Sequence, residues 1–188
     1  MSEGPGRGAS HTRPDRRRTW LVAAAVVAIA AGGIGAAVAL SGSGGSASGG
    51  RVGTAAPAFS VDTLRGGGRV SLASAGGRPL VLNFWASWCQ PCTQEMPALE
   101  AEHRVLGDRV AFVGIDTKDN REDGASFLRK VGVDYVSGFD PLAATFDAYG
   151  IIGMPTTFLI RPDGQVLYRH TGGLTQAGLD AVVHRYFG

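Results

Sequence analysis

The chain has 188 residues, enough for one domain of ordinary size plus additional segments. Its formal net charge of +2 is too small to indicate a protein that binds nucleic acid, so no such partner is expected. Two cysteines form a single Cys-x-x-Cys pair, which excludes a framework of several disulfides. The compartment in which the protein works therefore has to be inferred from other parts of the chain.

The first fifty residues divide into three segments of different character. Residues 1–19 are polar and rich in arginine, and the run from Trp20 to Leu40 carries no charge. Because about 20 apolar residues span a bilayer, the sequence predicts a single membrane anchor at 20–40. The basic arm 1–19 is expected in the cytoplasm and the rest of the chain outside. Residues 41–50 (SGSGGSASGG) predict a flexible linker, followed by a domain at 51–188.

Two other interpretations of the apolar run stay open. Ala37-Val38-Ala39 resembles a signal-peptidase site, and cleavage there would give a secreted protein. Arg17 and Arg18 weakly resemble a twin-arginine export signal, which would indicate export of a folded chain. No cysteine follows the run, so a lipoprotein anchor is excluded.

The globular part alternates between strand-like and helix-like patterns. Its first half predicts a hairpin of Val61–Leu64 with Arg69–Leu72, a strand 79–84, a helix from Pro91 to about Leu106, a strand 110–116, and a helix 121–131 capped by Asn120. The second half predicts a loop 134–139, a helix with Asp140 as N-cap and Pro141 as its first residue, a strand 157–160, its partner 166–171, and a helix from about Thr175 to Phe187. This order indicates an α/β fold, a mixed sheet with helices on both sides.

The two cysteines lie where the first central strand passes into the first long helix. Pro91 suits the first turn of that helix, where its missing N–H is no loss. Free N–H groups and the helix dipole favour an anion at this position, and a thiolate there has a lowered pKa. We therefore predict that Cys89, expected to be exposed, is the attacking thiol of disulfide exchange and that Cys92 is the resolving thiol.

Three other uses of the cysteine pair compete with this prediction. A purely structural disulfide would close a loop too short to stabilise the fold much. A zinc site needs about four ligands, and no two histidines among His11, His103, His170 and His184 are paired at ligand spacing. A c-type haem attachment needs a histidine where Thr93 stands, so it is excluded. No metal and no cofactor are expected.

Two motifs together resemble the thioredoxin superfamily. The sequence FWASWCQPC ends at Cys92, and GMPTTF follows at 153–158. The added hairpin and the apolar N-terminal run resemble the TlpA/ResA/CcmG branch, which consists of membrane-tethered thiol–disulfide oxidoreductases outside the cytoplasm. The resemblance covers roughly residues 52–187 and implies a thioredoxin fold with an added N-terminal β-hairpin.

The resemblance also implies roles for residues around the cysteines. Pro155 is expected to be a cis proline packed beside the pair, with the Met154 backbone available to an extended substrate segment. Substrate contacts are expected from five residues: Trp88, Gln90, Pro91, Met154 and Thr156. Trp85 is expected in the core.

The proton acceptor of the site departs from the pattern of cytoplasmic thioredoxins. Those proteins carry a buried aspartate six residues before the first cysteine, where this chain has Asn83. ResA-like proteins carry a glutamate at the position of Glu95, which is thought to handle the proton of the second cysteine. The resemblance thus implies that Glu95 serves Cys92. A glutamate that merely suits the helix dipole is the open alternative.

The proteins that this chain resembles are mostly reductants of client disulfides, for example in cytochrome c maturation, and receive electrons through a membrane protein. An oxidant stays open, because reduction potentials of such motifs differ by roughly 150 mV. A thiol peroxidase is the next alternative, because redoxin-type peroxidases share the Ala-Pro-x-Phe start at 56–59, although their Pro-x-x-x-Thr-x-x-Cys motif is absent. The last alternative is a non-catalytic carrier of copper or haem, which would bind its cargo with Cys89, Cys92 and a histidine. A monomer is expected.

Overall fold

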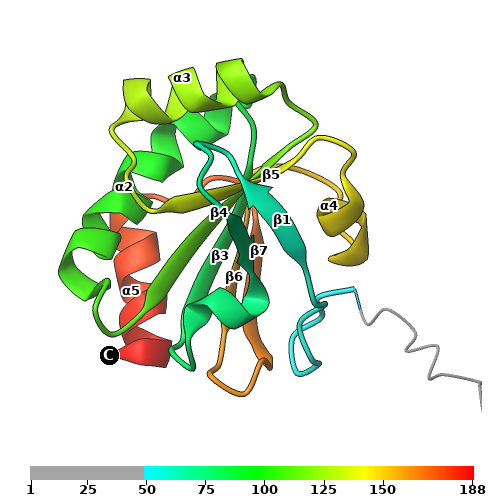
Figure 1. Cartoon of the computed structure of the whole chain (residues 1–188). Coiled ribbons are helices and arrows are strands. Elements are labelled where there is room, and N and C mark those ends of the chain that lie inside the picture. Colours follow the sequence, from blue (N-terminus) through cyan, green and yellow to red (C-terminus); the bar gives the residue numbers. More distant parts are fainter. Residues whose placement is uncertain (1–48) are drawn as a thin grey trace, which may run out of the picture. The chain divides into compact units, whose positions relative to one another are not determined.

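The computed structural model describes residues 49–188 (Figure 1). The predicted arm (1–19), anchor (20–40) and most of the linker (41–50) lie outside the described residues. Within 49–188, no helix is long and apolar enough to cross a membrane. Gly50 is buried at a φ of 59°, and a Cβ there would lie 3.0 Å from ring atoms of Tyr149 and Phe158. Since Arg169 also donates to the carbonyl of Gly49, the folded part begins before residue 51.

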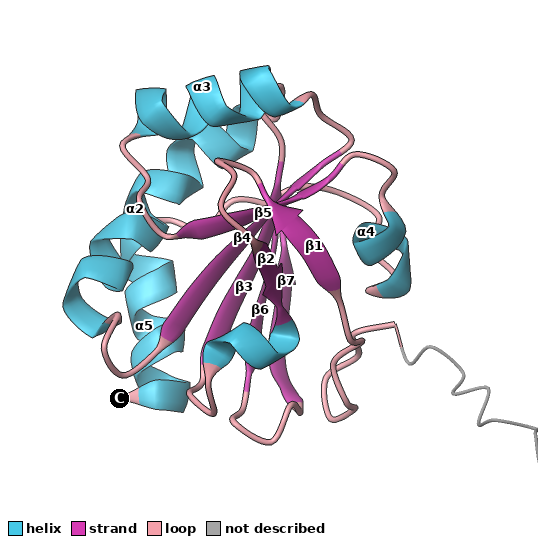
Figure 2. Cartoon of the chain, in the orientation of Figure 1, coloured by secondary structure: helices cyan, strands magenta, loops and turns pink. Residues whose placement is uncertain are grey.

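One seven-stranded mixed sheet forms the centre of the domain, with strands in the order β2-β1-β5-β4-β3-β6-β7 (Figure 2). The strands are β1 (Ser60–Thr63), β2 (Arg69–Ser71), β3 (Leu80–Trp85), β4 (Ala111–Thr117), β5 (Val136–Asp140), β6 (Thr156–Ile160) and β7 (Val166–Thr171). The α-helices are α2 (Gln90–Leu106), α3 (Arg121–Val131), α4 (Ala144–Ala148) and α5 (Gln176–Phe187), and a short 3-10 helix η1 covers Leu72–Ala75. Strands β3, β4 and β5 are parallel, whereas β6 and β7 run antiparallel to them. The predicted mixed sheet is confirmed.

Hydrophobic side chains pack on both faces of the sheet, which explains why β3 and β4 are buried along their whole length and mostly apolar. Helices α2, α3 and α5 cover one face, and α4 covers the other (Figure 1). Trp85 is fully buried on the first face, where its ring stacks on Phe127 with centroids 5.3 Å apart. Phe84 points to the second face, against Phe146, Tyr149 and Phe158. The alternation at the end of β3 fixes which residues face α2.

The predicted hairpin is confirmed, but the loop predicted over 134–139 is wrong. Residues 136–140 form β5, which joins the hairpin strand β1 to β4. Gly138 makes this possible, because a Cβ there would lie 2.4 Å from Cγ2 of Val61 and 2.8 Å from Cγ1 of Val70. Glycine has low strand propensity, and this segment is a strand because β4 pairs with it on one side and the hairpin strand β1 on the other.

The helix predicted to begin at Pro141 is shorter than expected. Asp140 is the last residue of β5, and α4 begins four residues later. The Asp140 carboxylate nevertheless accepts the N–H groups of Thr145 and Phe146, both at 3.0 Å. It caps the helix from the end of the strand, across a left-handed turn at Ala143 (φ 61°). The prediction of Asp140 as N-cap is therefore wrong, since Ala143 holds that position, and Pro141 lies outside the helix. The Asp140 side chain still accepts N–H groups of the first turn.

Candidate active site

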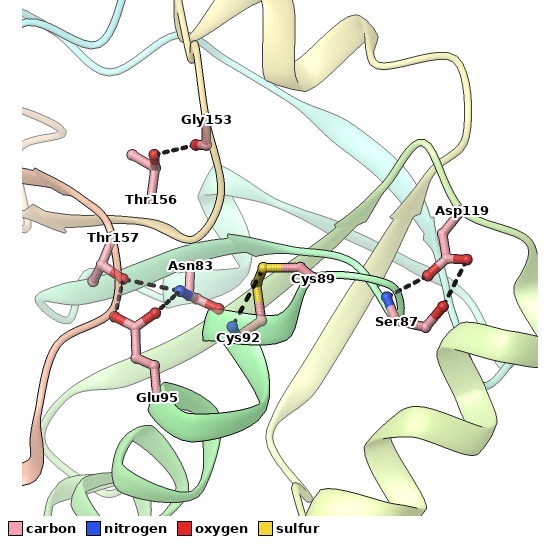
Figure 3. The surroundings of a disulfide bond; sticks show 9 residues. All are labelled: Asn83, Ser87, Cys89, Cys92, Glu95, Asp119, Gly153, Thr156 and Thr157. Carbon is pink, nitrogen blue, oxygen red and sulfur yellow. Dashed lines mark hydrogen bonds between the residues drawn. A yellow bond between two sulfur atoms is a disulfide. The ribbon is translucent and has the colours of Figure 1, made fainter.

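The cysteine pair lies at the start of α2, as predicted. Cys89 is the N-cap residue of the helix and Pro91 lies in its first turn. The two sulfurs are bonded to each other (Figure 3). Sγ of Cys89 also accepts the backbone N–H of Cys92 at 3.3 Å. An orphan N–H group of the helix start thus already points at the sulfur on which a thiolate would form.

The prediction that Cys89 is exposed is wrong for this disulfide-bonded form. Cys89 is 4% exposed and Cys92 is completely buried. Access to Cys89 is by a groove of about 380 Å³, whose walls come from the start of α2, the loop after β4, helix α4 and the loop before β6. It is lined by Trp88, Cys89, Gln90, Pro91, Lys118, Phe146, Ile152, Gly153 and Met154. A partner sulfur must therefore enter this groove to reach Cys89.

Glu95 lies behind the disulfide, one turn after Cys92 on α2, and has no exposed surface. Its Oε1 accepts the hydroxyl of Thr157 at 3.1 Å and its Oε2 accepts the Asn83 amide at 3.4 Å (Figure 3). The Asn83 amide also donates to Oγ1 of Thr157 at 2.9 Å. Side chains from α2, β3 and β6 thus form one buried hydrogen-bond network. A position at which the glutamate merely suits the helix dipole would be exposed, and this one is not.

The surroundings of Glu95 tune the proton affinity of its carboxyl group. Burial raises its pKa from 4.5 to about 7, although hydrogen bonds from Thr157, the Leu174 backbone and Asn83 act in the opposite direction. A carboxyl group of this pKa is ionised in about half of the molecules at neutral pH. It can therefore accept and return a proton within the physiological range.

The turn before Cys89 is held by the loop after β4. Asp119 accepts the Ser87 backbone N–H at 2.6 Å and the Ser87 hydroxyl at 3.0 Å (Figure 3). The indole N–H of Trp88 donates to the carbonyl of Lys118 at 3.1 Å. Trp88 is nevertheless 60% exposed and lines the groove beside the disulfide, and its predicted contact with substrate stays a prediction.

The predicted cis proline is confirmed, since the Met154–Pro155 peptide bond is cis. Pro155 is buried, and Met154 is partly exposed and lines the groove. Thr156 is fully buried, and its hydroxyl donates to the carbonyl of Gly153 at 2.7 Å and lies 3.0 Å from Oγ1 of Thr171. Thr156 thus holds the loop in place from behind, and a direct contact with substrate stays a prediction.

Within residues 49–188, one group of side chains has the spacing of metal ligands. Glu102, Asp180 and His184 each place one ligand atom within 4.8 Å of the others. Asp180 and His184 are about half exposed and already form an ion pair at 3.0 Å, and Gln176 donates to Glu102 at 2.9 Å. These contacts account for the cluster, and we assign no ion to it.

Comparison with known proteins places this geometry in a family. The model of the AhpC/TSA family matches residues 52–169. The chain belongs to this family. It is 30% identical to the thiol-disulfide oxidoreductase ResA of Bacillus subtilis over 71% of this chain and 73% of ResA. It is 37% identical to the thiol:disulfide interchange protein DsbE of Xylella fastidiosa, over 66% of this chain and 64% of that protein.

Solved structures agree on the fold. A thiol:disulfide interchange protein of the thioredoxin family from Chlorobium tepidum superimposes with a TM-score of 0.64 and 30% identity, over 73% of this chain and 99% of that one. A secreted disulfide oxidoreductase of Mycobacterium tuberculosis superimposes with a TM-score of 0.62 and 28% identity, over 68% of this chain and 95% of that one. The predicted thioredoxin fold and family are confirmed, and the chain is a thioredoxin-like thiol–disulfide oxidoreductase.

Several site residues were not found from the sequence. Thr157, which donates to Glu95, follows the predicted Thr156 but gave no signal of its own. Lys118 and Ile152 come from separate loops and Phe146 from α4, and only the folded sheet brings them to the groove. Asp119 also gave no local signal. It reaches Ser87 only because β3 and β4 are parallel, so that the loops after both strands lie at the same edge of the sheet.

Proposed function

We propose that this oxidoreductase works as a reductant of disulfides in client proteins. The observation that carries the activity is the Cys89–Cys92 disulfide at the start of α2, in a chain similar to ResA of Bacillus subtilis and DsbE of Xylella fastidiosa. That similarity also supports the direction, since the branch that the sequence resembles consists mostly of reductants of client disulfides. The direction itself is set by the reduction potential of the pair.

The reaction follows from the roles proposed for the two cysteines. The thiolate of Cys89 attacks one sulfur of a client disulfide, which breaks and releases the other client sulfur as a thiolate that takes up a proton. Cys92 then attacks Sγ of Cys89, the mixed disulfide breaks, and the second client sulfur leaves. The client gains two electrons and two protons, and the protein is left with the Cys89–Cys92 disulfide.

Glu95 is proposed as the proton acceptor for the second step. Cys92 is fully buried, so its thiol has no direct access to water. The carboxylate of Glu95, one turn away on the same helix, takes the proton of the Cys92 thiol as the resolving thiolate forms. Gln90, Pro91 and Met154 line the groove through which the client reaches Cys89.

The cellular setting is proposed from the N-terminal sequence and the relatives. The arm 1–19, anchor 20–40 and linker 41–50 would hold the domain outside the plasma membrane, and cleavage of the signal would instead give a secreted protein. A membrane protein would return two electrons to the Cys89–Cys92 disulfide. The similarity to ResA and DsbE supports cytochrome c maturation as the pathway of the clients. We propose that the chain acts as a monomer.

The reduction potential of the Cys89/Cys92 couple tests the proposed direction. A value near −270 mV or lower supports a reductant, and a value near −120 mV would show an oxidant. The measurement is an equilibration of the soluble domain against redox buffers, read by thiol alkylation. Reduction of the insulin disulfides gives the matching activity. Cys89→Ser serves as the control and must abolish it.

A thiol peroxidase is the second candidate, because the family match extends over the Ala-Pro-x-Phe start that redoxin-type peroxidases share. In their Pro-x-x-x-Thr-x-x-Cys motif, the positions seven and three residues before Cys89 hold proline and threonine, and this chain has Leu82 and Ala86 there. Peroxide consumption in the absence of a client, at a rate comparable to insulin reduction, would favour this candidate over the reductant.

A further inference from the structure

The groove in front of Cys89 combines apolar walls with a single positive charge. Trp88 and Ile152 are 60% and 93% exposed, which is unusual for such large apolar side chains, and both line the groove. Among the described residues that line it, Lys118 is the only charged one, and none is acidic. The start of α2 adds a partial positive charge at the same place.

Lys118 is held in this position by its own backbone. Its φ of 56° lies in the left-handed region, which residues other than glycine rarely adopt. Its carbonyl accepts the indole N–H of Trp88, and its N–H donates to the carbonyl of Asp140 at 3.3 Å. Its Nζ lies 4.5 Å from the centre of the Phe146 ring in the wall of the groove. A residue kept in a sparsely populated conformation beside a reactive group points to function.

No described carboxylate neutralises this lysine. Lys118 forms no ion pair with any acidic side chain within residues 49–188. The neighbouring Asp119 is engaged with Ser87 and with the backbone N–H of Asn120 at 2.8 Å. Lys118 therefore presents an unpaired cation to whatever enters the groove.

From this geometry we infer that the groove selects client segments in which the reacting cysteine is flanked by an apolar residue and an acidic one. The occupant is the client itself, since the groove gives access to Cys89 and a client sulfur must pass through it. The apolar residue packs on Trp88 and Ile152, and the carboxylate lies beside Nζ of Lys118. This inference rests on the proposed function and adds a sequence preference to it.

The preference can be measured with short synthetic peptides joined as disulfide dimers. In each, the cysteine lies between a leucine and a variable residue, which is aspartate, asparagine or lysine. Exposed ion pairs and like-charge contacts of this kind change rates by about 1.5- to 5-fold each. The wild-type domain should thus reduce the aspartate peptide up to about tenfold faster (kcat/KM) than the lysine peptide. The ratio should approach one in 1 M salt, where the screening length is about 3 Å.

Matched variants assign the preference to the groove. In Lys118→Met the ratio of kcat/KM for the aspartate peptide to kcat/KM for the lysine peptide should be close to one. In Lys118→Glu the lysine peptide should be reduced faster than the aspartate peptide. Lys130→Met removes the other lysine of the chain, on the exposed side of α3, and should keep the wild-type ratio. Any effect of Lys118 on the reactivity of Cys89 itself acts on all peptides alike and cancels in the ratio.

A second pair of variants tests the contact between the apolar residue of the client and the wall of the groove. Ile152→Ser should reduce kcat/KM severalfold for the leucine peptides and not for alanine counterparts. Leu142→Ser is the control, because Leu142 is 88% exposed but does not line the groove. Equal rates for the three charged forms in the wild-type domain, or a preference that survives in Lys118→Met, would overturn the inference and leave the proposed function intact. Failure to reduce any peptide would instead count against the proposed function.

Discussion

Two glutamates of α2, five residues apart, show how the partners of a buried carboxyl group decide its use. Glu95 is 0% exposed and Glu100 is 4% exposed. Burial alone raises the pKa of both. In the Glu95 pocket (Figure 3) the side-chain partners are a neutral hydroxyl and a neutral amide, and the pKa stays at about 7.

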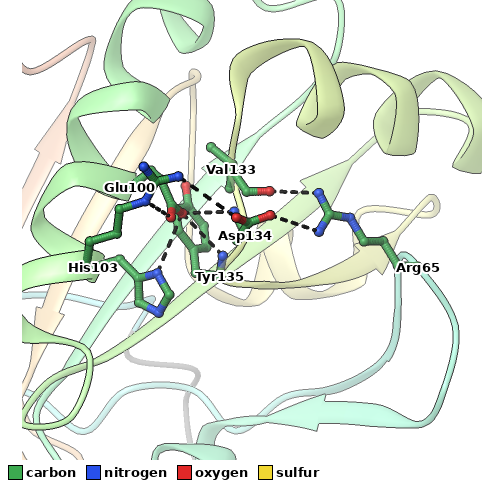
Figure 4. Close-up of polar contacts among 7 residues, drawn as sticks. Arg65, Glu100, His103, Val133, Asp134 and Tyr135 are labelled. Carbon is green, nitrogen blue, oxygen red and sulfur yellow. Dashed lines mark hydrogen bonds and ion pairs between the residues drawn. The ribbon is translucent and has the colours of Figure 1, made fainter.

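At Glu100 the hydrogen bonds and nearby charges lower the pKa by more than burial raises it. Although burial raises its pKa, the backbone N–H of Asp134, the guanidinium of Arg104, the N–H of Tyr135 and the charge of His103 together bring the pKa below its usual value (Figure 4). Glu100 accepts from Asp134 at 2.9 Å and from Arg104 at 2.9 Å. Its carboxylate is the favoured form at neutral pH and connects α2 to the loop before β5. Glu95, with neutral side-chain partners, can exchange protons.

The largest expected effect is on stability, from the substitution Glu100→Leu. It leaves the part-buried N–H of Asp134 and the buried N–H of Tyr135 without their acceptor, and Arg104 with only its longer ion pair to Asp134 at 3.9 Å. We expect a loss of about 3–4 kcal/mol in the free energy of unfolding, measured with urea. Arg104→Leu removes only an exposed partner and should cost about 1 kcal/mol or less. A cost for Glu100→Leu as small as that of the control would contradict the comparison.

The pH dependence of stability should separate the two carboxyl groups. The folded-state pKa of Glu95 is raised, so the folded protein binds more protons than the unfolded chain between pH 4.5 and about 7. Its contribution to stability therefore falls as pH rises through that window, by about 3 kcal/mol in total. Glu100, whose pKa is lowered, contributes stability that is lost as the pH falls below the ordinary glutamate value. The test is the unfolding free energy of the oxidised wild type minus that of Glu95→Gln, which should fall by about 3 kcal/mol from pH 4.5 to 8, since glutamine does not titrate.

Catalysis should depend on Glu95 alone among the acids of α2. In Glu95→Gln we expect the release of the mixed disulfide to slow by about 10²-fold at pH 7, since a positioned general base contributes about that much. The rise of the wild-type rate with pH through about 7 should also disappear. Glu102→Gln, on the same helix, should keep both the rate and the rise. An unchanged pH profile in Glu95→Gln would refute the proposed role.

The sequence predicted most of the fold because local patterns and tertiary packing agree there. Helix α3 begins and ends at the predicted residues, with Asn120 accepting the N–H of Asp123 as its cap. The failure at β5 is of another kind. Residues 136–140 have no pattern of their own and become a strand because β4 and the hairpin supply partners on both sides. Such a strand depends on contacts remote in sequence, which no local signal contains.

The same distinction applies to the site. Cys89, Cys92, Glu95 and the cis bond at Pro155 belong to motifs, so the sequence located them. No local pattern indicates that Thr157 and Asn83 converge on Glu95, because strand pairing creates that contact. Asn83 lies directly opposite Thr157 in the register of β3 and β6. A prediction that included this register would have placed both side chains on the face of the sheet covered by α2.

The smallest expected effect, from Thr157→Val, sharpens the comparison most directly. Valine has nearly the shape of threonine but cannot donate to Oε1 of Glu95 or accept from the Asn83 amide. The loss in unfolding free energy should be only about 1 kcal/mol. Because the lost hydroxyl stabilised the carboxylate, the pKa of Glu95 should rise further, and the pH at which disulfide exchange reaches half its maximum should move upward. Thr145→Val, on the opposite face of the sheet, is the matched control and should leave that midpoint unchanged. If the midpoint stayed in place in Thr157→Val as well, the neutral partners of Glu95 would not be what keeps its proton exchangeable near neutral pH.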